Sequence, residues 1–277
     1  MLTNQPKDLV NLIEQILLTE SISVNGNELI AYCFVLAEEY KKLPEFDESE
    51  MWRWNEMLSH NEKMLPKVLS KVKIEYVADD PYPNMKAMMY DMTVNRRMKI
   101  FASDGEGYKH GISPKENDKF RAIHDYIGHF SKNAKAFKEF LEKNGIKDGK
   151  DGRIAEYRFS GNNFTVRGEM NAYLTHAKLA TEGAKAALFT EIVGQIATYF
   201  TTGNYTDNKV AVMKGVDFKN IGKFTDPKLE KRKQEYVRQL EDDNVSVIKT
   251  DVGNVIKSEI NYGMLSRGEA ATHRKTR

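Results

Sequence analysis

The segment from Ser113 to Leu141 constrains the fold most, because its pattern of side chains specifies one long helix. Apolar residues recur there at steps of three, four and seven, as on a buried helix face: Phe120, Ile123, Ile127, Phe130, Phe137 and Leu141. Upstream, Ser113 suits an N-cap, Pro114 suits the first helical position, and Glu116 can reach back to the cap. We interpret the rest of the chain as a frame for this helix and the two that follow it.

The remaining pattern is mostly helical. Apolar periodicity predicts helices at 6–19, 28–42, from 47 to a bend or an end near Pro66, 164–181, 184–201 and 226–242. Three segments predict a small antiparallel sheet in front of the long helix: 73–78, 85–92 and 97–102. The predicted class is therefore mainly α with a small antiparallel β-sheet (α+β). Three regions are expected: N-terminal helices (1–72), a metal-binding catalytic core (73–205), and a charged C-terminal helix and tail (206–277).

Composition excludes several classes of protein. The 277 residues carry a net charge of only +2, so no overall field indicates a nucleic-acid partner. The single cysteine, Cys33, excludes an internal disulfide and a zinc site built from several cysteines. The chain has no apolar window of about twenty residues that could span a membrane, and its first residues do not resemble a secretory signal. We expect a cytoplasmic protein without a membrane partner.

Two histidines make the long helix chemically unusual. His124 lies beside the apolar face, where an imidazole is costly unless a hydrogen bond or a metal ion satisfies it. His129 follows five residues later. On the next predicted helix, Glu169 and His176 are seven residues apart and lie almost in line. The two histidines with Glu169 or His176 are therefore candidate ligands of one metal ion.

The spacing of the two histidines leaves two interpretations open. In a regular helix, positions five apart diverge by about 140°, whereas zinc-binding pairs favour a separation of about four residues. Gly128 permits a local bulge that would bring both rings to one side. Without the bulge, one histidine is a hydrogen-bonded core residue and the other faces solvent.

A family resemblance supports the metal interpretation. His124-Asp-Tyr-Ile-Gly-His129 resembles the H-E-x-x-G-H zinc motif of dipeptidyl peptidase III-type metallopeptidases, and Gly168-Glu169-Met-Asn-Ala-Tyr173 is similar to their later glutamate helix. Thr190-Glu-Ile-Val-Gly-Gln195 completes a pattern typical of uncharacterised phage and mobile-element proteins with metallopeptidase-like domains. The resemblance covers roughly residues 85–205. It implies a zincin-like core in a phage-encoded protein of the host cytoplasm or the virion.

The resemblance also implies roles for individual residues. His124, His129 and Glu169 would ligate Zn²⁺, with Asp125 as the general base in place of the family's longer glutamate. The developing oxyanion would be stabilised by His110, Arg167 or His176. Glu191, supported by Gln195, would orient a ligating histidine. The substrate would be a peptide.

Two alternatives use the same residues. His124-Asp125 followed by Ile127-Gly128-His129 also resembles the His-Asp signature of metal-dependent phosphohydrolases, with one residue inserted. There Mn²⁺ or Fe²⁺ would act on a phosphorylated small molecule, a nucleotide or nucleic acid, with an earlier ligand from His110 or His60 and a later one from Asp207. The third alternative is a non-enzymatic phage structural or interaction protein with a protein partner. Metal content separates the three.

Overall fold

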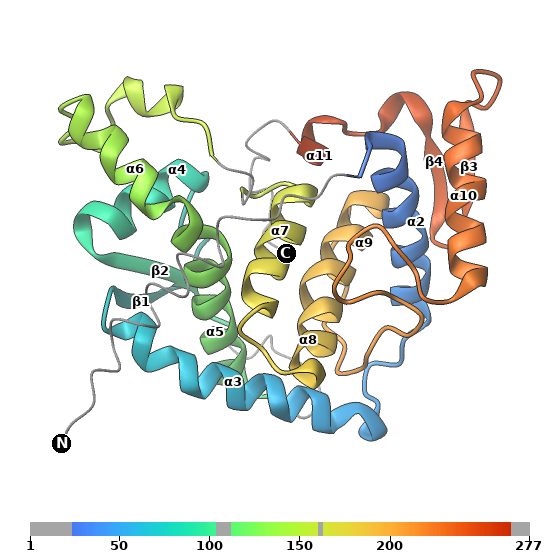
Figure 1. The fold of residues 1–277 in the computed structure, drawn as a ribbon, viewed down its shortest axis with the longest axis horizontal. Coiled ribbons are helices and arrows are strands. Elements are labelled where there is room, and N and C mark those ends of the chain that lie inside the picture. Colours follow the sequence, from blue (N-terminus) through green and yellow to red (C-terminus); the bar gives the residue numbers. More distant parts are fainter. Residues whose placement is uncertain (1–23, 104–111, 160–162, 267–277) are drawn as a thin grey trace.

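Helices dominate the architecture (Figure 1), as the class predicted from the sequence requires. The computed structural model describes residues 24–103, 112–159 and 163–266. The predicted helix at 6–19 and His110 lie outside these ranges. In Figure 1, α3 (Met51–Leu69) runs along the lower edge, below α5 (Pro114–Ile123) and α8 (Glu182–Leu188), and α7 (Val166–Ala177) stands at the centre. The turn that follows α5 and the helix α7 hold the candidate site described below.

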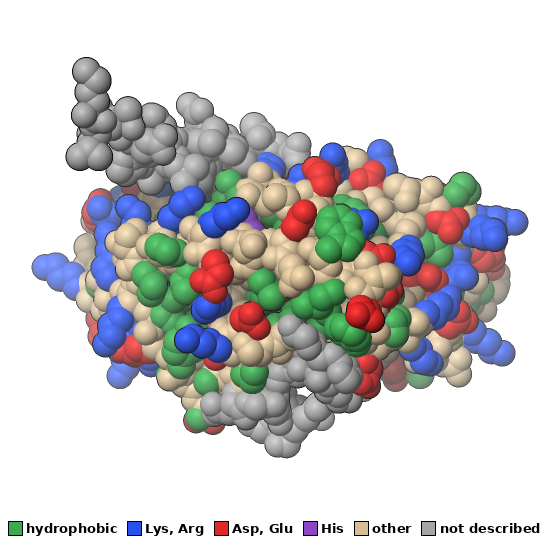
Figure 2. Space-filling view, turned by 90° about the horizontal axis from the view of Figure 1, so that it is seen from below, with side chains coloured by type: hydrophobic (Ala, Val, Ile, Leu, Met, Phe, Trp, Pro, Cys, Tyr) green, Lys and Arg blue, Asp and Glu red, His purple; other side chains and the backbone are tan. Residues whose placement is uncertain are grey.

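The surface mixes both signs of charge. Figure 2 shows the molecule from below the view of Figure 1. On this face Lys and Arg side chains are interspersed with Asp and Glu. None of the helices in the described ranges is long and apolar enough to cross a lipid bilayer.

The helices that precede and follow the centre lie close to their predicted positions. Asn25 caps α2 (Gly26–Lys42), and its side chain accepts a hydrogen bond from the Glu28 backbone N–H. A 3₁₀ turn (Glu48–Glu50) leads into α3, which passes Pro66 and ends three residues later at Leu69. The charged segment forms α10 (Pro227–Glu241), capped by Asp226.

The strand prediction was partly wrong. β1 (Lys73–Val77) and β2 (Arg97–Phe101) form as expected but pair in parallel, not antiparallel. The predicted strand at 85–92 is instead α4 (Met85–Tyr90), which continues into a π turn (Asp91–Asn95). The Asn84 side chain caps α4. Buried methionines recur at helical spacing along α4 and the π turn: Met85, Met88, Met89 and Met92. A helix between two strands supplies the crossover that parallel pairing requires.

The antiparallel sheet lies elsewhere in the chain. It is a hairpin of β3 (Val247–Thr250) and β4 (Gly253–Ile256), which the sequence pattern did not predict. Each strand has only four residues. A segment of that length carries too little alternation to distinguish it from a loop.

The long helix forms as predicted, with one irregularity. It comprises α5 (Pro114–Ile123), a π turn η3 (His124–Phe130) and α6 (Ser131–Lys143) in direct succession. The predicted capping box is present, because the Ser113 side chain accepts from the Glu116 N–H and the Glu116 carboxylate accepts from the Ser113 N–H.

The next two predicted helices are α7 (Val166–Ala177) and a segment that again contains a π turn. That segment comprises α8 (Glu182–Leu188), η5 (Phe189–Gly194) and α9 (Gln195–Thr202). Thr165 caps α7 and Thr181 caps α8 through their side-chain oxygens. Short elements complete the described fold: the 3₁₀ turns Gly152–Glu156 and Lys257–Glu259, and α11 (Gly263–Ser266).

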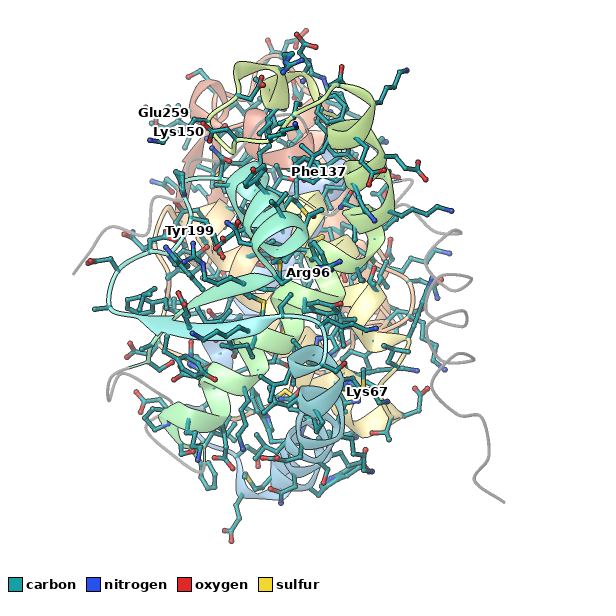
Figure 3. The ribbon with its side chains drawn as sticks, turned by 90° about the vertical axis from the view of Figure 1, so that its left-hand side faces the viewer. Lys67, Arg96, Phe137, Lys150, Tyr199 and Glu259 are labelled. Atoms are coloured by element: carbon teal, nitrogen blue, oxygen red, sulfur yellow. The ribbon has the colours of Figure 1, made fainter. Side chains whose placement is uncertain are left out.

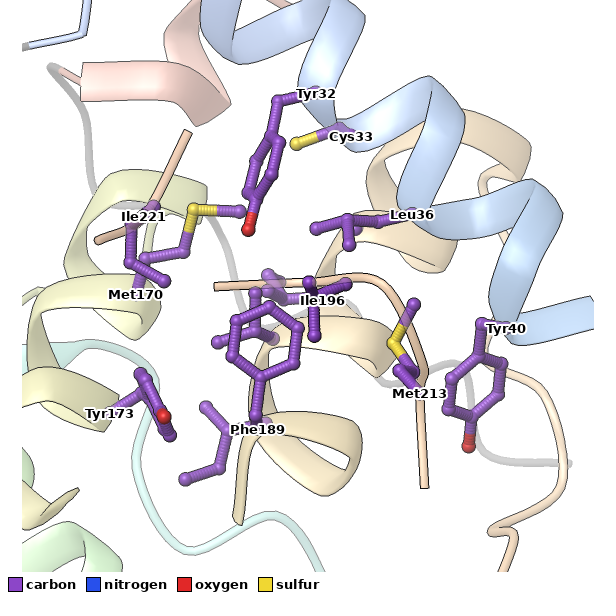
Figure 4. Packing of buried hydrophobic residues seen from close by; sticks show 14 of the residues in the cluster. Tyr32, Cys33, Leu36, Tyr40, Met170, Tyr173, Phe189, Ile196, Met213 and Ile221 are labelled. Atoms are coloured by element: carbon purple, nitrogen blue, oxygen red, sulfur yellow. The ribbon is translucent and has the colours of Figure 1, made fainter. Parts of the chain in front are cut away.

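Two apolar clusters hold these elements together. One lies around α4, β2 and the long helix, where Phe137 is fully buried (Figure 3). The other joins α2, α7 and the α8–α9 segment, with Tyr32, Leu36 and Phe189 in mutual packing (Figure 4). The second cluster also brings α2 against α10, although these helices lie far apart in the sequence. An ion pair joins the two helices, with Arg232 Nη1 2.9 Å from Oε2 of the buried Glu38.

Candidate metal centre

The π turn in the long helix places both histidines on one side. A π turn makes hydrogen bonds between residues five apart, so His124 and His129 stand over one another instead of diverging. The bulge predicted at Gly128 is therefore present. Gly128 also lets α7 approach, because a Cβ built on it would lie 3.0 Å from Ala172 Cβ and 3.1 Å from the Ala172 carbonyl oxygen.

Glu169 completes a group of three donors. Its position in the first turn of α7 places the carboxylate opposite the π turn, which packs directly on that helix. Glu169 Oε2 lies 3.3 Å from His124 Nε2 and 3.2 Å from His129 Nε2, and the two imidazole nitrogens are 3.2 Å apart. These three side chains can hold a metal ion.

The spacing of the donors fits a tetrahedral ion. Zinc ligands at about 2.0–2.1 Å from the metal are about 3.3–3.4 Å apart when the geometry is tetrahedral. The three measured separations, 3.2, 3.2 and 3.3 Å, form a nearly equilateral triangle of that size. A regular helix could not produce this triangle, since it would turn one ring away from the carboxylate.

The donors are largely buried, and nearby charge keeps Glu169 in the form that can bind a metal ion. His129 is 1% exposed and His124 is 8% exposed. Burial by itself raises the pKa of Glu169, but His129 and then His124 outweigh it, and the pKa falls well below its ordinary value. Glu169 is therefore a carboxylate at neutral pH, as a metal ligand must be.

Neighbouring side chains fix the rings. The His124 ring stacks on Phe120, with centroids 5.9 Å apart, and the His129 ring meets the edge of Phe164 at 5.1 Å. Asn133 Nδ2 donates to the His129 carbonyl oxygen at 3.2 Å. Fixed rings lower the entropy that metal binding would otherwise cost.

The three donors open onto a cavity of about 220 Å³. Asp125, the predicted base, lines this cavity beside its neighbour His124. The long helix also contributes Arg121, one turn before Asp125. Another part of the lining comes from η5 and α9, which supply Glu191 and Gln195. The cavity thus brings together the three donors, a carboxylate beside them, and a separate polar wall.

Two predicted residues lie outside the cavity lining. Arg167 Nη2 donates to the Val24 carbonyl oxygen at 2.8 Å. His176 is fully buried, with its ring centroid 6.1 Å from that of His124 and 5.2 Å from that of His60. Burial, with smaller contributions from His60 and His124, holds the pKa of His176 well below its ordinary value, so the ring is neutral. Glu169 belongs to the three-donor group and His176 does not, and neither Arg167 nor His176 lines the cavity.

Sequence reasoning missed Arg121 and Asn208, which both line the cavity. Arg121 is three residues before His124 and four before Asp125 on the same helix, and that spacing could have identified it. Asn208 accepts a hydrogen bond from Gln195 Nε2 at 2.7 Å, a contact between a helix and a connecting segment that no local pattern predicts.

Of the outer ligands expected for a phosphohydrolase, His60 and Asp207 neither belong to the three-donor group nor line the cavity, and His110 lies outside the described residues. Asp125 is not part of the three-donor group. The His60 ring packs on His176, and the Asp207 carbonyl oxygen accepts from the Tyr40 hydroxyl at 3.4 Å. No protein-family model, no curated protein and no solved structure matches this chain.

Proposed function

We propose that this chain is a zinc-dependent hydrolase that cleaves an amide bond of a peptide. One observation carries the proposal: two imidazole nitrogens and one carboxylate oxygen lie 3.2–3.3 Å from one another and line a cavity that Asp125 also lines. Two histidines and a glutamate form a common ligand set of catalytic zinc, which keeps its fourth position open for water.

Each described residue then has a chemical task. His124, His129 and Glu169 would hold the ion, which lowers the pKa of a bound water toward ~7 when present. The Asp125 carboxylate accepts a proton from the attacking water and can return it to the leaving amine. The Arg121 guanidinium is a permanent cation on the lining and stabilises negative charge on the carbonyl oxygen of the substrate.

The phosphohydrolase alternative has less support. Its signature requires the histidine and the adjacent aspartate to share the ion, whereas Glu169 occupies the third corner here and Asp125 stands beside the group. Its hard cations also favour sites rich in oxygen ligands, and two of the three donors are imidazole nitrogens.

Metal content tests the proposal. We expect about one zinc per chain in protein purified without added metal, measured by inductively coupled plasma mass spectrometry. His124→Ala and Glu169→Ala should each lose the zinc, and Glu142→Gln, at an exposed carboxylate on α6, should keep it. A wild-type protein that binds no zinc even in equilibrium dialysis would reject the proposal and leave an interaction protein.

Activity separates the two enzyme classes. Asp125→Asn should retain zinc and lose hydrolysis of a fluorogenic peptide library by roughly 100-fold or more, because the proton acceptor is gone. If Asp125→Ala instead removes bound Mn²⁺ or Fe²⁺, and the wild-type protein hydrolyses phosphate esters but no peptides, the chain is a phosphohydrolase.

A further inference from the structure

The side chains that line the cavity are mostly negative, within the part of the chain that the structure describes. Four carboxylates, from Asp80, Asp125, Glu169 and Glu191, stand against one guanidinium, from Arg121. A divalent ion cancels two of these charges and Arg121 cancels a third, so the lining keeps one net negative charge. Such a lining attracts a cationic ligand and repels a phosphate.

The proposed reaction leaves two carboxylates of this set unused, the exposed Asp80 and the buried Glu191. Glu191 lies within the π turn η5 and is only 8% exposed. Ile192 and Ile196 line the same wall, and both are mostly buried. A carboxylate between apolar side chains interacts more strongly with a cation than one in water does, because little solvent screens the pair.

The wall around Glu191 also offers neutral hydrogen-bonding groups. Gln195 follows one turn later, and its Nε2 donates to Asn208 Oδ1 at 2.7 Å. Both amides line the cavity, and their mutual hydrogen bond holds them in one orientation. Paired amides of this kind complement the N–H and C=O groups of a peptide backbone.

We infer that the cavity takes a peptide carrying a protonated amine or a guanidinium, and that Glu191 determines this specificity by receiving the cation. The inference deepens the hydrolase proposed above and rests on it for the peptide. The cation is either the amino terminus of the substrate or a basic side chain. Both present the same chemistry to Glu191.

Three dipeptide hydroxamates distinguish these two sources of the cation. The hydroxamate group binds zinc in all three, so a difference in affinity comes from the charge that the rest of the probe presents to Glu191. The first has an acetylated amino terminus and a lysine, the second an acetylated amino terminus and a norleucine, and the third a free amino terminus and a norleucine. Their Kd values are measured by calorimetry on zinc-loaded wild-type protein, Glu191→Gln and the exposed control Glu235→Gln.

We expect one cationic probe to bind the wild-type protein and Glu235→Gln roughly 10- to 100-fold more tightly than the neutral probe, as a charged hydrogen-bonded pair provides. Glu191→Gln should bind all three alike with unchanged zinc content. The cationic probe with the advantage identifies the source of the charge.

Three results would overturn the inference: equal affinities of the three probes for the wild-type protein, a preference that persists in Glu191→Gln, or displacement of the neutral probe by micromolar inorganic phosphate. The wild-type comparison decides the question even if Glu191→Gln does not fold. Failure of the proposed function has a different signature, which is zinc-loaded protein that binds the probes but hydrolyses no peptide.

Discussion

Gly128→Ala tests the geometry on which the site depends. The added methyl group would lie 3.0 Å from Ala172 Cβ, 3.1 Å from the Ala172 carbonyl oxygen and 3.2 Å from His124 Nδ1. All three distances are shorter than ordinary contacts, and two of the three atoms belong to α7. The methyl group can therefore fit only if α7 moves away or the His124 ring turns.

Either adjustment weakens the metal centre. Glu169 lies one turn before Ala172 on α7, so a shift of about 0.5 Å in that helix exceeds the ~0.2 Å tolerance of zinc–ligand distances. We expect the zinc Kd to rise by about 10- to 100-fold, as when other supports of a metal ligand are lost. The effect on folding should be smaller, because overpacking costs about 1–3 kcal/mol and alanine regains about 1 kcal/mol of helix propensity.

Competition with a chromophoric chelator measures the zinc Kd, and urea denaturation of the metal-free protein measures stability. Gly152→Ala is the matched control, because a Cβ there meets no atom within 4 Å. If Gly128→Ala binds zinc as tightly as the wild-type protein and is more stable, the close approach of α7 does not position Glu169, and the reasoning fails.

Three further predictions follow from the described contacts. Asp125→Glu should raise kcat on the best peptide, because a carboxylate one methylene longer reaches the attacking water better; a zinc-loaded but slower variant would contradict this. Burial, with Lys67 and Lys63, lowers the pKa of His60 in the folded protein from its ordinary value of 6.5 to about 4. Between these two pH values the imidazole is mostly protonated in the unfolded chain and mostly neutral in the folded protein. The free energy of unfolding should be unaffected by His60 above pH 6.5 and should decline as the pH falls toward 4, by about 2 kcal/mol at pH 5. Urea titrations at several pH values should show a weaker decline in His60→Gln. Glu38→Ala should cost about 1–3 kcal/mol in urea unfolding, because it removes the buried carboxylate that accepts from the Tyr236 hydroxyl, whereas Arg232 keeps Glu39 as a partner. Glu39→Ala should cost less than about 1 kcal/mol, because its pair with Arg232 is partly exposed. Equal losses at the two positions would show that burial of the Glu38 carboxylate is unimportant.

Much of the secondary structure could be predicted from the sequence because its signals are local. The capping box at Ser113 and the apolar steps from Phe120 to Leu141 involve residues that are neighbours on one helix surface, so periodicity alone reveals them. The segment 85–92 was wrongly predicted as a strand, although its methionines recur at helical steps and Asn84 is a strong cap. The local pattern of this segment has the period of a helix, not that of a strand.

The residues of the candidate site also differ in how far the sequence predicts them. His124 and His129 could be named from residue type and order, and the bulge at Gly128 could be anticipated from the glycine. Spacing alone left Glu169 and His176 open as the third donor, because both lie on one face of α7, and only the family resemblance favoured Glu169. The packing of α7 on the π turn brings Glu169 to the two imidazoles. The roles proposed for Asp125 and Glu191 remain predictions.

The amino-acid order by itself determined most of the helices and which side chains are candidate metal ligands, since those properties depend on residues within a turn or two of each other. Tertiary structure alone decided that β1 and β2 run parallel, that three donor atoms from two helices meet within 3.3 Å, and that Glu191 lines the same cavity as these donors. Those outcomes depend on how separate elements pack, and packing is settled by the shape and burial of surfaces far apart in the chain.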